Sequence, residues 1–95
     1  RKNSVLVFSS AGVAMTGGGM GGGQFAIPWA QVRSLDVQGA DEVKFTHNHR
    51  IDLNSSAVIV ELRSSDVLVF EVKLRRPATM RSTLAPILSM VRSLR

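Results

Sequence analysis

The sequence predicts one mostly-β (α+β) domain over residues 1–95, with about seven short antiparallel strands in a barrel or sandwich and one C-terminal amphipathic helix that caps it. Apolar and polar residues alternate in short runs as far as Leu74, and beyond it the apolar spacing becomes helical. No helical pattern separates consecutive strands, which excludes parallel strand–helix–strand crossovers. A chain of 95 residues is long enough for one hydrophobic core.

The first expected element is a β-hairpin formed by two short apolar runs, residues 5–8 and residues 13–16. Ser10, Ala11 and Gly12 lie between the runs and favour a tight turn. Residues 17–23 contain six glycines. Because glycine loses much backbone entropy on ordering, we expect a flexible hairpin loop there.

The middle of the chain predicts further short strands and one helical turn. The turn is expected at residues 28–32, because Pro28 suits a first helical position and Trp29 and Val32 lie three residues apart. Alternating residues predict strands at 24–27, 35–37, 43–45 and 51–53. The segment 47–49, His-Asn-His, is expected to form a hairpin tip between the last two of these strands.

The last part of the chain gives the clearest signals. Residues 58–62 and 67–74 alternate strictly around a turn at residues 64–66, which predicts a strand pair with one solvated face. A helix is expected over residues 77–94, with Pro77 in its first turn. Pro86 inside this span either kinks one helix or lies in the first turn of a helix that starts near Thr83. Its apolar stripe consists of Met80, Leu84, Leu88 and Val91.

Composition limits the class of protein. The net charge is +5 and cysteine is absent, so a disulfide framework or a cysteine-ligated metal is excluded. No apolar run reaches the roughly 18–20 residues that a membrane-spanning helix needs. We therefore expect a cytoplasmic, intracellular location, with a position at the periphery of a membrane as the alternative.

The order of the expected elements resembles the pleckstrin-homology-like superfold, in particular its bacterial PH-like and GRAM-type modules. The resemblance rests on the hairpin at 12–16, the turn and strand at 27–35, the strand pair at 57–74 and the helix at 77–94. It implies a scaffold that binds phosphoinositides, peptides or protein domains. Members that bind phosphoinositides carry basic residues in the first hairpin loop, whereas residues 9–12 here contain none. This departure favours protein recognition.

The sequence offers no pattern typical of an enzyme. Its serines lack the context of a nucleophile elbow, and no lysine follows the glycine tract as it would in a phosphate-binding loop. His47 and His49 are two residues apart, but further ligands for a structural metal are not apparent. We expect no catalytic residues, no metal and no cofactor.

The expected function is therefore that of a non-catalytic binding or adaptor module that recognises a protein partner within a larger protein or assembly. The alternative is an adaptor for an anionic membrane, whose headgroups would bind the basic strand–helix junction. Nucleic acid is disfavoured because no exposed aromatic accompanies these basic residues, and self-association stays open. The basic residues of the junction are Lys73, Arg75, Arg76 and Arg81.

Two further residues are candidate contacts for a partner. Trp29 follows a proline and suits an anchor at an interface, although Ile27 and Val32 beside it favour packing in the core. Met20 interrupts the glycine tract and is a candidate apolar contact if that loop becomes ordered on a partner.

Overall fold

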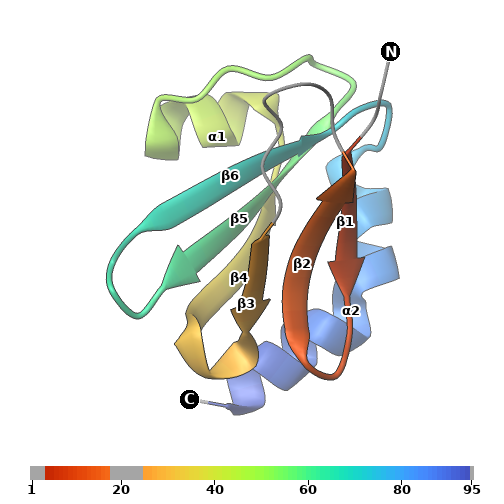
Figure 1. Cartoon of the computed structure of the whole chain (residues 1–95). Helices are drawn as coiled ribbons and strands as arrows, with labels where there is room; N and C mark the ends of the chain where they lie inside the picture. The colour runs from red at the N-terminus through yellow and green to blue at the C-terminus, as the bar shows by residue number, and fades with distance from the viewer. Residues whose placement is uncertain (1–3, 18–24, 95) are drawn as a thin grey trace. The chain divides into compact units, whose positions relative to one another are not determined.

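The computed structural model describes residues 4–17 and 25–94 (Figure 1). Contacts divide the chain into two compact units, Arg1–Val32 and Arg33–Arg95. The strands form two separate three-stranded sheets, with orders β1-β2-β3 and β4-β5-β6. Within the described part of the chain, no helix combines the length and the apolar character needed to cross a membrane.

The first unit is an antiparallel sheet followed by a short 3-10 helix. The strands are β1 (Ser4–Phe8), β2 (Gly12–Gly17) and β3 (Phe25–Pro28), and the helix is η1 (Trp29–Gln31). The backbones of Ser9 and Gly12 exchange hydrogen bonds of 3.0 and 3.3 Å and so close the turn between β1 and β2. The expected first hairpin and the helical turn after Pro28 are therefore confirmed. Most of the expected glycine loop lies outside the described residues.

Gly12 has a specific reason to be glycine. Its φ is +152°, and a Cβ built on it would lie 2.0 Å from the carbonyl oxygen of Ile27. Gly12 pairs with Pro28 in the register of β2 with β3, so the two backbones approach closely at this point. A side chain here would force these strands apart.

The second unit contains three strands and two α-helices. In chain order they are β4 (Val32–Gln38), α1 (Ala40–His47), β5 (Ser56–Leu62), β6 (Val67–Val72) and α2 (Pro77–Ser93). β5 pairs with β6 antiparallel, from Ser56↔Val72 to Glu61↔Val67. The expected strand pair and the expected C-terminal helix are present, and Pro86 lies inside α2 without ending it.

The core of the second unit lies around β5. This strand lies between β4 and β6, and residues 55–60 are buried without interruption, so both of its faces are covered. Val43 of α1 packs with Ala57 and Ile59, and the half-buried Ile51 and Val69 extend this cluster. Along α2 the buried residues are Met80, Leu84 and Val91.

The predicted fold class is wrong in two respects. The described residues form six strands in two sheets and do not close into a barrel, and a second helix is present. The segment around Val43 and Phe45 was expected to be a strand but forms α1, because Asp41 and Glu42 suit a helical first turn and Asn48 ends the helix at φ +52°.

The strand expected at 51–53 and the hairpin tip expected at 47–49 are wrong as well. His47 is the last residue of α1, and residues 48–55 form the connection between α1 and β5. Ile51 and Leu53 do not share a buried face as a strand would require, since Ile51 packs against the core while Leu53 is 78% exposed.

Candidate binding surface

Three of the predicted basic residues lie on one exposed turn. Lys73, Arg75 and Arg76 occupy the connection between β6 and α2, and all three are exposed. Between them lies Leu74, whose side chain is 83% exposed and whose φ is +62°. The turn therefore places three cations and one large apolar side chain in solvent.

The turn is attached to the loop between α1 and β5. Lys73 Nζ lies 3.3 Å from a carboxylate oxygen of Asp52, and Arg76 donates to Asn54 Oδ1 at 3.3 Å. The hydroxyl of Ser56 donates to the carbonyl oxygen of Arg75. In Figure 1 this loop and this turn lie at the same end of the β5–β6 pair.

Leu53 lies in this loop between Asp52 and Asn54, which make those two contacts, and it is exposed. We define the junction surface as Leu53, Lys73, Leu74, Arg75 and Arg76. The guanidinium of Arg75 has no polar partner among the described residues. The Lys73–Asp52 pair is about 70% exposed on both sides, so it neutralises Lys73 only weakly.

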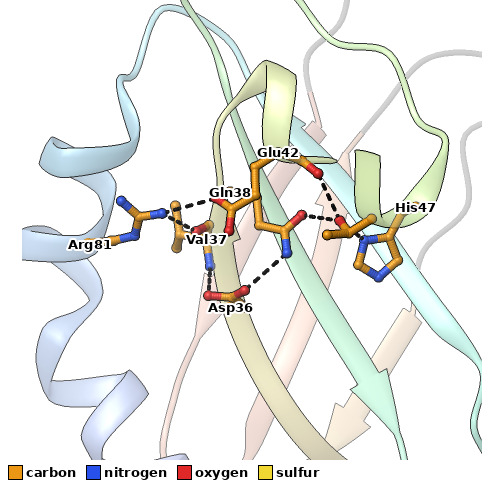
Figure 2. A network of polar contacts seen from close by, with 7 residues as sticks. Asp36, Val37, Gln38, Glu42, His47 and Arg81 are labelled. Carbon is orange, nitrogen blue, oxygen red and sulfur yellow. Dashed lines mark hydrogen bonds and ion pairs between the residues drawn. The ribbon is translucent and has the colours of Figure 1, made fainter. Parts of the chain in front are cut away.

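Arg81 is held elsewhere and does not join the junction surface. Its guanidinium donates to the carbonyl oxygen of Val37 at 2.8 Å and lies 3.4 Å from a carboxylate oxygen of Glu42 (Figure 2). The first contact ties α2 to the end of β4, and the second ties α2 to α1. The four basic residues expected to act together are thus separated. Three of them lie in the exposed turn, whereas Arg81 forms a structural clamp, the contacts that join α2 to β4 and α1.

The polar contacts continue from this clamp to the end of α1. Asp36 accepts from the backbone N–H of Val37 at 2.8 Å and from Gln38 Nε2 at 3.2 Å (Figure 2). The Thr46 hydroxyl lies 2.7 Å from Gln38 Oε1 and 2.7 Å from His47 Nδ1. Gln38 is only 6% exposed, and these contacts satisfy both ends of its amide. The network therefore has a structural role.

The other sequence candidates lie apart from the junction surface. Trp29 is 8% exposed, its ring stacks on Phe8 with centroids 6.5 Å apart, and its Nε1 donates to the carbonyl oxygen of Ser9 at 2.8 Å. These contacts give Trp29 a packing role within the first unit. Met20 lies outside the described residues.

Among the described residues, no three His, Asp or Glu side chains come together as ligands for a metal. The first unit has a small open hollow with mainly aliphatic walls, which no ionisable side chain lines. Its lining residues are Ser9, Ala11, Gly12, Val13, Ala14, Ala26, Ile27 and Pro28.

Sequence reasoning missed the two leucines of the junction surface. Leu53 was expected in a strand, and Leu74 was expected on the apolar face of the last strand, which in fact ends at Val72. The available signal was local: Leu74 has Lys73 before it and two arginines after it, directly ahead of a proline that starts a helix.

Comparison with known proteins gives no relative: no protein-family model, no curated protein and no solved structure matches this chain. The resemblance to pleckstrin-homology-like modules therefore stays a prediction. The junction surface is therefore the feature of this chain that bears on function.

Proposed function

We propose that this chain is a non-catalytic binding module that docks on an anionic membrane surface through the junction surface. The observation that carries the proposal is the exposed turn with Lys73, Arg75 and Arg76, in which three of four consecutive residues are cationic. The hydroxyl of Ser56 donates to the backbone of this turn at Arg75, so this contact does not depend on the Arg75 side chain.

Electrostatics supports this choice of partner. A cation close to an anionic leaflet contributes about 1 kcal/mol of binding free energy. Lys73, Arg75 and Arg76 together thus contribute on the order of 3 kcal/mol, and the net charge of +5 adds long-range attraction. This attraction should weaken with added salt, because the charges are solvent-exposed.

Vesicle sedimentation tests the proposal. We expect the protein to bind phosphatidylcholine vesicles that contain phosphatidylserine, to ignore vesicles of phosphatidylcholine alone, and to lose affinity as salt rises. The variant Arg75→Ala/Arg76→Ala should bind roughly 30-fold more weakly, which corresponds to about 1 kcal/mol for each charge.

The matched control is Lys44→Ala/Arg92→Ala, which removes two exposed cations outside the junction surface. It should lose much less affinity than Arg75→Ala/Arg76→Ala. Equal losses in both variants would show that only the net charge matters and would contradict a localised binding surface.

A protein partner is the second candidate, and Phe45 favours it. This side chain is 91% exposed on α1, and exposed aromatic residues are common anchors at protein interfaces. A photo-crosslinking amino acid at position 45, compared with one at the exposed Ser89, tests this candidate in cells that contain the protein. A defined adduct specific to position 45 would support it, and equal labelling at both positions would oppose it.

A further inference from the structure

We infer that Leu53 and Leu74 form an apolar tip that inserts into the boundary between the headgroups and acyl chains of an anionic bilayer. This inference rests on the proposed function, because the cations of the junction surface bring the tip to the membrane. The two leucines are 78% and 83% exposed. Both therefore present large apolar side chains to solvent and contribute little to a core.

Contacts between the loop before β5 and the turn after β6 place Leu53 and Leu74 on adjoining segments. Asp52 contacts Lys73 through its carboxylate, and its backbone N–H donates to a carboxylate oxygen of Glu71 at 3.1 Å. On the other side of Leu53, Asn54 contacts Arg76. Residues on both sides of Leu53 thus contact residues on both sides of Leu74. These contacts connect the two segments that carry the apolar tip.

The backbone at Leu74 gives a second, independent indication. Its φ of +62° lies in the left-handed region, which glycine and asparagine occupy readily and leucine avoids. Leucine at this position therefore fits neither its backbone conformation nor its solvent environment. Residues that break both local rules are expected where a side chain serves function.

The chemistry of the tip fits a bilayer better than a protein partner. Stable attachment to a membrane surface takes two signals, one apolar group that enters the acyl region and one group of cations that binds anionic headgroups. The junction surface supplies both within one turn and its neighbouring loop. The aliphatic stems of Lys73, Arg75 and Arg76 let their charges stay at the headgroups while the leucines lie deeper.

Site-specific fluorescence tests the insertion, and the chain suits this method because it contains no cysteine. The variants Leu53→Cys, Leu74→Cys and Ser64→Cys are each labelled with nitrobenzoxadiazole, whose emission shifts to the blue in an apolar environment. Ser64 is the control, because it lies in the exposed turn at the other end of the β5–β6 pair (Figure 1). We expect a blue shift at positions 53 and 74, but not at 64, when phosphatidylserine-containing vesicles are added.

The outcomes separate the inference from the proposed function. Binding to the vesicles without a blue shift at 53 or 74 overturns insertion and leaves electrostatic docking intact. The absence of binding overturns both, and the junction surface would then be assigned to a protein partner.

A label-free variant completes the test. Leu53→Asn/Leu74→Asn keeps all charges, and asparagine tolerates the backbone of position 74. Its affinity for the same vesicles should fall roughly tenfold or more, because two apolar side chains no longer leave water. Unchanged affinity in a variant that remains folded would overturn the inference.

Discussion

Among the positions with positive φ in the described residues, Gly12 and Leu74 differ most clearly. The turn at Gly12 has φ +152° and the residue that such a backbone requires, since a Cβ there would meet the carbonyl oxygen of Ile27 at 2.0 Å. The turn at Leu74 has φ +62° and a bulky residue whose side chain lies in solvent. The first obeys the local rules of folding and the second breaks them.

We interpret this difference as one between a residue that folding requires, Gly12, and a residue that binding requires, Leu74. Gly12 allows β2 and β3 to pair, and any other residue would disrupt the sheet of the first unit. Leu74 is 83% exposed and gives no comparable reason from folding, which is why we propose that its side chain binds a membrane. Substitutions at positive-φ positions test whether folding requires the residue at each of them.

The largest expected effect is at Gly12. Gly12→Ala should lower the free energy of unfolding by about 3 kcal/mol, because the new Cβ collides with backbone atoms that cannot move aside cheaply. Denaturant unfolding measures the loss. Gly39→Ala is the control, because its Cβ would meet only the ring of Pro77 at 3.2 Å. It should cost less than about 1 kcal/mol. Equal losses would show that the close approach at Gly12 is not the cause.

A smaller effect of opposite sign is expected at Leu74. Leu74→Gly should raise the free energy of unfolding by about 1 kcal/mol, since the strain of a left-handed leucine disappears and little buried surface is lost. The same unfolding experiment measures it. A decrease in stability would mean that the Leu74 side chain supports the fold and would weaken the argument for function.

The smallest expected effect is at Ser65. This residue has φ +79° in the turn between β5 and β6, where its N–H donates to the carbonyl oxygen of Leu62 at 2.9 Å. Ser65→Gly should stabilise the protein by about 0.5 kcal/mol, because glycine suits this position of a three-residue hairpin loop. A loss of stability in thermal unfolding would contradict this interpretation of the loop.

Strictly patterned elements could be predicted from the sequence, and short ambiguous ones could not. The alternation around Val58 and Phe70 and the helical stripe of Met80 and Leu84 are long enough to fix the element type. The segment with Val43 and Phe45 offers only two apolar residues two apart, which suits a strand or one buried position on a short helix. The structure shows the helix, with Val43 buried and Phe45 exposed.

The candidate site was predicted only as a sequence cluster of charges. Lys73, Arg75 and Arg76 share one turn as expected, whereas Arg81 is bound to Val37 and Glu42, which are far from it in sequence. Leu53 is assigned to the junction surface because the loop before β5 contacts the turn after β6. Such long-range contacts, and the positive φ of Leu74, leave no periodic signal in the sequence.

The most direct test of the central claim compares three proteins in one vesicle-binding titration: the natural chain, Leu74→Gly and Ser65→Gly. Both substitutions relieve a positive-φ residue, but only one removes a member of the junction surface. We expect Ser65→Gly to bind phosphatidylserine-containing vesicles like the natural chain, and Leu74→Gly to bind several-fold more weakly although it is more stable. Equal binding by all three proteins would contradict the claim that the Leu74 side chain contributes to membrane binding.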